Sequence, residues 1–572
     1  MNKFDWQLWK KFLAIAKPYW FSEEKWGARG ILALLLLLSL SVSGLNVLIS
    51  FVGRIFQNAL VEKNPEEFWK YLFIYAGVFV VGTPIMVIYR YTRDKLGLYW
   101  REWLTKSFLN KYLQNRAYYE INAIKTIDNP DQRISQDIRS FTVTSLGFLL
   151  VILISLIDLI SFTGILWSIS IPLTVVLVGY SILGTVVTVL FGRRLIGLNF
   201  NQLRREADFR YGLVHVRNHA EAIAFYQGEE QEGMQLKSRF REVISNFNAL
   251  IGWQRNLDFF TTAYGYFIII LPSVVVAPMY FAGEIDFGAI SQAGFAFSQV
   301  LGALSIVVNK FEQISAFAAG INRLSVFTDT LEAQTARKQI ERTIYLREYS
   351  QLSLEHITLE TPNHKTLVAD LSVEVPEGTG MLIVGHSGVG KSSLLRGIAG
   401  LWNSGTGRLV RPPLDEILFL PQRPYMILGT LRDQLLYPQT DRVACAQRIR
   451  HVTDAKLQAV LERVNLADLA ERLGGFDTEL DWDDVLSLGE QQRLAFARLL
   501  LTKAPYAILD EATSALDLQN EASLYQPLQE SATTYISVGH RASLLKYHQL
   551  VLELEGNQQW RVMSADKYDP SS

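Results

Sequence analysis

A glycine-rich loop at residues 385–392 is the part of this sequence that most directly predicts chemistry. It reads GHSGVGKS and fits the pattern G-x-x-x-x-G-K-[ST], with a strand-like apolar segment before it and a helix-like segment after it. Its glycines let backbone N–H groups converge on phosphate, while Lys391 reaches the β- and γ-phosphates and Ser392 ligates Mg²⁺. The sequence therefore predicts bound ATP and Mg²⁺. The loop residues expected to contact the nucleotide are Gly385, Ser387, Gly388, Gly390, Lys391, Ser392 and Ser393.

A pair of carboxylates ends the apolar segment YAILDE at residues 506–511. This is the pattern of a Walker B strand, in which Asp510 holds Mg²⁺ directly or through water and Glu511 polarises the attacking water. Such a strand is more often structural when it stands alone. Because a phosphate-binding loop lies upstream, we interpret the pair as hydrolytic, with Glu511 as a catalytic residue.

The segment LSLGEQQR at residues 486–493 resembles the signature of the ABC ATPases. In that family the serine and glycine at this helix start, here Ser487 and Gly489, bind the γ-phosphate of ATP held by the opposite subunit. The resemblance also makes Gln422 the Q-loop residue, expected to aid catalysis and to ligate Mg²⁺. It places Asp517 in the D-loop, as a further nucleotide contact.

One further residue matches the ABC pattern, and the sequence departs from that pattern at two positions. His540 corresponds to the catalytic switch histidine that senses the γ-phosphate, although a lone histidine is more often a satisfied polar residue. Leu488 replaces a glycine usual in the signature, so we expect slower ATP turnover rather than its loss. The aromatic residue that stacks on adenine has no counterpart at residues 360–362, and Tyr345 and Tyr349 are the candidate substitutes.

Long uncharged stretches in the first half of the chain predict transmembrane helices. A span needs about 20 mainly apolar residues, and charged residues mark the ends of the stretches that are long enough. The third and fourth spans form a tight hairpin, because Pro172 offers a break within one continuous stretch. The six expected spans lie between Arg29 and Arg54, Lys70 and Arg90, Arg139 and Arg193 (two spans), Asp258 and Glu284, and Asp286 and Lys310.

Basic residues accumulate between spans two and three and between spans four and five, which predicts that both segments are cytosolic. The short segments after spans three and five carry no Lys or Arg, so both termini are expected in the cytosol of a multi-pass protein of a bacterial-type inner (plasma) membrane. The cytosolic segments are long and rich in helix formers. They are expected to extend the membrane helices, as in an exporter-like ABC fold.

The expected fold is an α-helical six-span transmembrane domain followed by an α/β P-loop ABC nucleotide-binding domain. Residues 1–30 are interpreted as an interfacial helix with Trp6 and Trp9 on its apolar face, the alternative being the first turns of a packed helix. The transmembrane domain covers residues 31–325. A linker covers 326–347, and the nucleotide-binding domain 348–572.

The net charge of −1 gives no indication of a nucleic-acid partner held by bulk electrostatics. A lipid bilayer is the expected partner, and nucleic acid is not. Cys445, the only cysteine, excludes an internal disulfide and a metal cluster built on cysteines, and fits a reduced cytosolic setting.

Several runs resemble one branch of the ABC family. Those in the second half resemble the D-type, peroxisomal fatty-acid transporters, and those in the first half resemble the SbmA/BacA-like bacterial group. The run at 221–226 implies coupling of the membrane helices to the nucleotide domain, the alternative being an ordinary cytosolic helix face. The runs are RGIAGLW (396–402), FLPQRPYM (419–426), GTLRDQL (429–435), SEEKW (22–26), WREWLT (100–105), DNPDQRI (128–134) and EAIAFY (221–226).

The resemblance implies a half-transporter that works as a homodimer, because each ATP lies between the P-loop of one subunit and the signature of the other. It implies ATP hydrolysis coupled to movement of a substrate, with import of hydrophilic compounds such as peptides or cobalamin as one interpretation. A fatty-acid or acyl-CoA transporter and a membrane-anchored regulatory ATPase are the alternatives.

Asp158 is the only ionisable residue in the uncharged run from Ser140 to Gly192. A charge in hydrocarbon costs at least about 2.5–3.5 kcal/mol on insertion scales, so we expect this residue to face the transport pathway or a partner group. The alternative is a carboxyl that reaches the outer interface near Trp167, or is protonated, without a role in transport.

Overall fold

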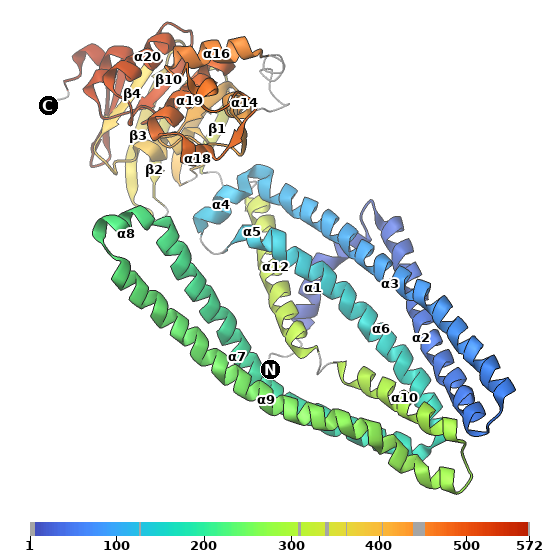
Figure 1. The fold of residues 1–572 in the computed structure, drawn as a ribbon. Coiled ribbons are helices and arrows are strands. Elements are labelled where there is room, and N and C mark those ends of the chain that lie inside the picture. Colours follow the sequence, from blue (N-terminus) through green and yellow to red (C-terminus); the bar gives the residue numbers. More distant parts are fainter. Residues whose placement is uncertain are drawn as a thin grey trace. The chain divides into compact units, whose positions relative to one another are not determined.

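The computed structural model of the chain describes residues 6–124, 127, 129–306, 310–337, 343–361, 363–402, 404–438 and 452–569. The chain divides into two compact units, Met1–Arg337 and Lys338–Ser572 (Figure 1). The first unit is built from helices, whereas the second combines helices with β-sheets. Cys445 lies outside the described residues.

Six helices of the first unit are long and apolar enough to cross a membrane, which confirms the six expected spans. Polar residues between the spans cap the helices: Asn64 accepts a hydrogen bond from the backbone of Glu67, and Ser170 accepts one from the backbone of Leu173. The break expected near Pro172 therefore falls at Ser170. The spanning helices are α2 (Lys25–Val61), α3 (Pro65–Leu113), α6 (Ile138–Ile169), α7 (Ile171–Asn218), α9 (Glu229–Phe281) and α10 (Phe287–Leu304).

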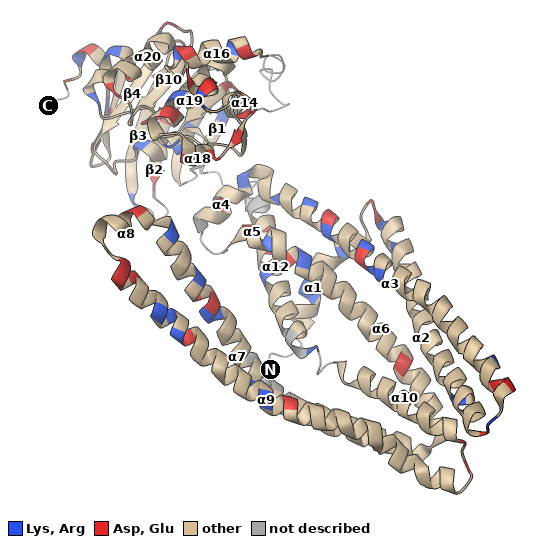
Figure 2. Ribbon diagram, viewed as in Figure 1, with Lys and Arg blue, Asp and Glu red and all other residues tan. Residues whose placement is uncertain are grey.

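Helices α7 and α9 are much longer than a bilayer requires and pack along each other as a hairpin closed by α8 (Ala220–Tyr226). Figure 1 shows this green hairpin standing away from α2, α3 and α6 over most of its length. Charged residues lie mainly in the half of the hairpin next to α8, whereas the opposite half is almost uniformly uncharged (Figure 2). This distribution fits a membrane segment with a long water-exposed extension.

Shorter helices complete the first unit. An ion pair joins two of them, because the buried Asp137 of η2 accepts from the half-exposed Arg323 of α12 at 2.8 and 2.7 Å. The bidentate geometry fixes α12 at the N-terminal end of α6, which follows η2 directly. These helices are α1 (Trp6–Trp20), η1 (Gln114–Arg116), α4 (Ala117–Ile124), α5 (Pro130–Gln132), η2 (Arg133–Asp137) and α12 (Phe311–Arg337).

Three sequence expectations concern these segments. In α1 the buried side chains are Ile15, Ala16 and Tyr19, whereas Trp6 and Trp9 are exposed, and the interfacial position of this helix stays a prediction. The sixth span ends at Leu304, within the expected limits of Asp286 and Lys310. The boundary between the two units, after Arg337, falls inside the segment expected as a linker, 326–347, which also contains the last part of α12 and the first residues of strand β1.

The second unit is centred on a six-stranded sheet with the order β12-β11-β4-β10-β9-β6. All neighbouring strands are parallel except β11 and β12, so the carboxyl ends of β4, β9, β10 and β6 lie at one edge. The strands are β4 (Gly380–Gly385), β6 (Ile417–Leu420), β9 (Tyr506–Asp510), β10 (Thr534–Val538), β11 (Leu550–Gly556) and β12 (Gln559–Ser564).

A four-stranded sheet with the order β1-β5-β2-β3 forms the second layer of strands. Its strands are β1 (Ile344–Glu348), β2 (Leu352–Glu360), β3 (Thr366–Val375) and β5 (Gly405–Arg411), and a separate pair is β7 (Gly429–Thr430) with β8 (Glu479–Leu480). The helices are α13 (Lys391–Ile398), η3 (Leu414–Glu416), α14 (Leu431–Leu436), α16 (Asp454–Arg463), α17 (Leu469–Arg472), α18 (Trp482–Val485), α19 (Leu488–Thr502), α20 (Leu518–Gln529), η4 (Ala542–Tyr547) and η5 (Ala565–Lys567).

Candidate functional site

The glycine-rich loop connects β4 to α13, as the sequence predicts. Gly385, Gly388 and Gly390 have φ values of 140°, 85° and 111°, a region that side chains with a Cβ rarely adopt. A Cβ on Gly385 would lie 2.4 Å from the carbonyl oxygen of Leu554. The loop conformation therefore requires glycine, and it presents its backbone at the start of α13.

Lys391, the first residue of α13, is folded back onto its own loop. Its Nζ donates to the carbonyl oxygens of Gly385 at 2.6 Å and His386 at 2.9 Å. Burial lowers the pKa of Lys391, and the carboxylates of Glu511 and Asp510 oppose this shift. The ammonium group thus lies within the loop that is expected to hold the β- and γ-phosphates.

Two of the three side chains expected to hold Mg²⁺, Ser392 and Asp510, meet between α13 and the end of β9, whereas the third, Gln422, contacts Glu511. Ser392 Oγ donates to Asp510 Oδ1 at 3.5 Å. Burial and the adjacent charge of Glu511 raise the pKa of Asp510. A hydroxyl and a carboxylate are the hard oxygen ligands that Mg²⁺ prefers, so the residues present fit this ion. Ser393 follows on α13 and is partly buried.

Glu511 lies between the two other residues expected to act in hydrolysis. Gln422 Nε2 donates to its Oε2 at 2.8 Å, and His540 Nε2 lies 3.4 Å from its Oε1. These three residues follow the carboxyl ends of β6, β9 and β10. Glu511 also has a φ of 49°, an uncommon backbone conformation for a residue other than glycine and one that tends to occur at functional sites.

The signature segment begins helix α19 with a reciprocal cap. Ser487 donates through its backbone N–H and its hydroxyl to Glu490 Oε2, and the backbone N–H of Glu490 donates to Ser487 Oγ. Leu488 is the first residue of a regular helix turn, where glycine is not required. A Cβ on Gly489 would lie 3.3 Å from the carbonyl oxygen of Ala515, so this glycine allows close approach of the D-loop.

Two residues that the sequence analysis did not assign connect these motifs. Gln492 is buried and donates to the carbonyl of Gln422 at 2.9 Å and to Ser514 Oγ at 3.1 Å, so it joins the signature helix to the Q-loop and the D-loop. Arg541 donates to the carbonyl of Leu516 at 2.6 Å. Gln492 lies in the signature segment and Arg541 follows His540. Their hydrogen-bond partners are more than 20 residues away in sequence, so no local pattern indicates these contacts.

The structure also places Asp517 and the two tyrosines that are expected to contact the nucleotide. Asp517 caps α20 by accepting from the backbone of Asn520 at 2.7 Å, which gives its carboxylate a structural role in the D-loop. Tyr345 and Tyr349 belong to or follow β1, the edge strand farthest from β3, whereas β3 contacts the phosphate loop. Their assignment as adenine contacts stays a prediction.

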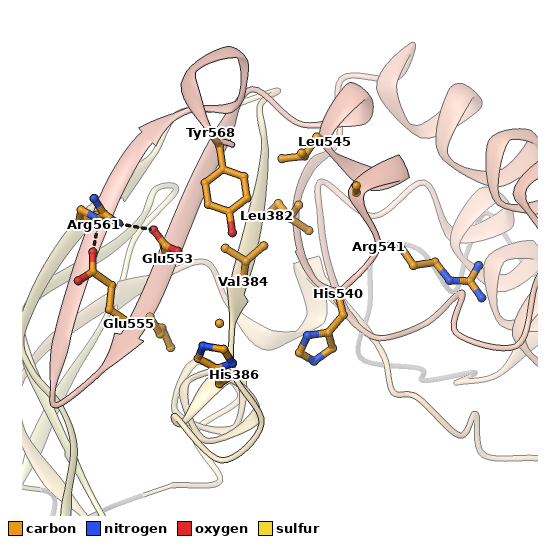
Figure 3. Close-up of a pocket in the computed structure, with 14 residues that line it drawn as sticks. Leu382, Val384, His386, His540, Arg541, Leu545, Glu553, Glu555, Arg561 and Tyr568 are labelled. Atoms are coloured by element: carbon orange, nitrogen blue, oxygen red, sulfur yellow. Dashed lines mark hydrogen bonds and ion pairs between the residues drawn. The ribbon is translucent and has the colours of Figure 1, made fainter. Parts of the chain in front are cut away.

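A cavity of 430 Å³ borders the phosphate loop on the side of β11 and β12. Figure 3 shows His386 and His540 at one end of it and Tyr568 at the other, while Arg541 points away. Arg561 of β12 pairs with Glu553 and Glu555 along its wall. Lys391 and Asp510 do not line this cavity, so it adjoins the nucleotide site without containing it.

His548 supports the strand that ends at the switch histidine. Its Nδ1 donates to the carbonyl of Leu544 at 2.7 Å, and its Nε2 accepts from the hydroxyl of Ser537, on β10, at 2.8 Å. Tyr525 in turn donates to Ser537 Oγ. Burial disfavours the charged imidazolium and lowers the pKa of His548 to about 4, although the hydrogen bond to the Leu544 carbonyl opposes this shift.

This neutral histidine predicts that acid destabilises the nucleotide unit. Between the ordinary histidine pKa of 6.5 and about 4, the unfolded chain binds a proton that the folded chain does not, so stability is full above 6.5 and falls as the pH drops. From pH ~7 to pH ~5 the expected loss is about 2 kcal/mol in the opening free energy of β10, measured by hydrogen exchange on the full-length protein and corrected for intrinsic rates. His548→Gln removes this pH dependence, whereas the exposed control His364→Gln keeps it. An equal pH dependence in all three proteins contradicts the assignment.

Comparison with known proteins agrees with this arrangement. Residues 15–281 match the family described as ABC transporter transmembrane region 2, and residues 368–514 match the family described as ABC transporter. A bacterial Atm1-family ABC exporter with ATP bound has the same fold, with a TM-score of 0.72 at 18% identity over 94% of this chain and 96% of that chain. The exporter-like fold is thereby confirmed.

Curated relatives cover nearly the whole chain. An ABC transporter ATP-binding protein of Synechocystis is 50% identical over 94% of this chain and 82% of its own length. ABC transporter D family member 2, chloroplastic, of Arabidopsis thaliana is 44% identical over 98% and 89%. The lysosomal cobalamin transporter ABCD4 of Homo sapiens is 32% identical over 98% and 97%. The chain therefore belongs to the ABC transporters, as a half-transporter of the D family whose ATPase domain is coupled to a multi-pass membrane domain.

Proposed function

We propose that two copies of this chain form a homodimer that binds two ATP molecules with Mg²⁺ and imports a hydrophilic compound across a bacterial-type inner membrane, with both termini in the cytosol. The observation that carries this proposal is the division of the nucleotide machinery. Each chain has one phosphate loop at the start of α13 and one signature at the start of α19. In ABC ATPases these two elements serve one nucleotide only when they come from different subunits, so two chains make two complete sites.

Within each site the residues of this chain divide the work. Lys391 leaves its loop carbonyls and neutralises the β- and γ-phosphates, while Ser392 and Asp510 hold Mg²⁺, which offsets charge on the phosphate oxygens. Glu511 accepts a hydrogen bond from the attacking water and takes its proton. Gln422 and His540, already in contact with the Glu511 carboxylate, orient that carboxylate and bind the γ-phosphate.

The cytosolic part of the α7–α9 hairpin supports the dimer. The span expected in α7 ends before Arg193, yet Phe200 and Leu203 beyond it are 68% and 73% exposed. Met234 and Phe247 on α9 are also exposed. Lipid does not cover this part of the hairpin, so a second copy of the chain is the surface that would bury these side chains.

The chemical class of the substrate rests on a relative and on the membrane helices. The human relative named as a cobalamin transporter covers 98% of the chain. The sequence runs that resemble the SbmA/BacA-like group also favour import of hydrophilic compounds. Buried polar side chains within the spans, including Asp158 and Gln292, also favour a polar substrate over an acyl chain.

Transport by purified protein tests this proposal. Proteoliposomes with the nucleotide units outside, loaded with radiolabelled cobalamin, should lose the label when Mg²⁺ and ATP are added, because import moves substrate towards the nucleotide side. Liposomes with Glu511→Gln chains should retain it. Export of labelled acyl-CoA instead would establish the fatty-acid alternative. Hydrolysis of ATP without movement of cobalamin, peptide or acyl-CoA would contradict the import proposal and favour a membrane-anchored regulatory ATPase.

A further inference from the structure

Unpartnered polar groups gather between three spanning helices. Ser43, Ser50 and Gln57 follow one another at seven-residue intervals on α2, which places them on one face of that helix over about 21 Å. Ser43 Oγ, Ser50 Oγ and Gln57 Oε1 are buried without a hydrogen-bond partner, as are Asp158 Oδ1 on α6 and Gln292 Nε2 on α10. We call these five residues the polar seam.

Asp158 is the only acid in the seam and lies deep in the membrane. It is 8% exposed and faces Ser43, which is 1% exposed. Eleven residues separate it from Ile169 at the outer end of α6, or about 16 Å, which is close to half the thickness of the hydrocarbon layer. Water and headgroups are therefore out of its reach in this packing.

No charged side chain on the helices packed against α6 lies level with Asp158, within the part of the chain that the structure describes. On α2, Arg29 is 14 residues before Ser43 and Arg54 is 11 residues after it, about 21 and 16 Å along the helix. Helix α10 has no Asp, Glu, Lys, Arg or His. The nearest titratable group on α3, Tyr89, faces Ser39, one turn further in on α2.

The other charged groups on the elements that pack against α6 lie at the ends of the spans. Arg54 is itself paired with Asp286 at 2.6 Å, and Arg323 with Asp137 at 2.7 Å. An ionised Asp158 would thus be a buried charge without a counter-ion, which is among the most costly arrangements in a protein. By sequence, further charges at these ends include Glu66, Lys70 and Arg90 on α3, Arg139 on α6, and Arg193 and Arg194 on α7.

We propose that Asp158 is a proton-binding site of the transport cycle: its carboxyl holds a proton while α2, α6 and α10 are packed as here, and releases it when these helices separate. In the release step the O–H bond breaks, the electron pair stays on the carboxylate, and the proton passes to water that enters the seam. The packing around Asp158 is closed, so a proton is the ligand that we expect to fit there. The inference rests on the proposed function in one respect: ATP binding must change the packing of α2, α6 and α10.

The test compares proton exchange in chains that bind ATP without hydrolysing it. Glu511→Gln protein in lipid nanodiscs is mixed with Mg²⁺ and ATP in weak buffer, and released or absorbed protons are read with an indicator dye. The expected difference between this protein and the same protein carrying Asp158→Asn is up to one proton per chain. The matched control is Asp94→Asn, because Asp94 is exposed and paired with Arg93, and this variant should behave as its parent.

Radiolabelled ATP retained on a filter, measured in parallel, separates this inference from the proposed function. If ATP is not retained by any variant, the proposed function fails. If ATP is retained equally and proton exchange is the same with and without Asp158→Asn, the proton site is contradicted. If Asp158→Asn fails to fold, infrared difference spectra of the protein with Asp158 intact provide the test. A protonated carboxyl band is expected to be present in only one of the two states, with or without ATP. A band that is unchanged by ATP overturns the proposal.

Discussion

Lys391→Ala should reduce ATP hydrolysis by about 10²–10³-fold, because the lost ammonium group can no longer neutralise charge that develops on the β- and γ-phosphates. In the structure this group already lies among the loop carbonyls of Gly385 and His386, so its removal leaves the loop without a cation at its centre. Phosphate release by the purified protein in lipid nanodiscs measures the effect.

A second lysine provides the control for this experiment. Lys456 is exposed on α16, and Lys456→Ala should hydrolyse ATP at the rate of the unaltered protein. Hydrolysis by Lys391→Ala at near-normal rate, in protein whose helix content and dimer mass are unchanged, would contradict the assignment of the phosphate loop.

Glu511→Gln should lower hydrolysis by about 10²–10⁴-fold while ATP still binds, because the amide keeps the size of the side chain but cannot take a proton from water. The amide can still meet Gln422, whose Nε2 now donates to the Glu511 carboxylate at 2.8 Å. Glu462→Gln, an exposed change on α16, serves as the control and should be silent. A parental rate for Glu511→Gln would exclude Glu511 as the base.

Local patterns predicted much of this structure. The six spans are confirmed because a bilayer imposes a fixed length of apolar residues, and charged residues mark the ends. The phosphate loop, the strand YAILD and the helix after Ser487 also form where the sequence indicates, because strand, turn and cap each depend on neighbouring residues. The functional roles of the site residues stay predictions.

Contacts between distant segments could not be predicted in the same way. Most of strand β1 lies in the segment expected as a linker. No local pattern predicts this strand, because its partner β5 begins about 60 residues later and supplies its hydrogen bonds. Gln492 gave no separate signal, because its importance comes from meeting the carbonyl of Gln422 and the Ser514 hydroxyl across the fold.

The most direct measurement of the central claim is a cross-link between a phosphate loop and a signature in different chains. In Glu511→Gln protein with Cys445→Ser, one chain population carries Ser387→Cys and the other Ser487→Cys, and a short thiol cross-linker is added with and without ATP. The account predicts an ATP-dependent cross-linked dimer in the mixture and none when either population is alone. An ATP-dependent cross-link within a single chain carrying both cysteines, with none between chains, would contradict a site shared by two subunits.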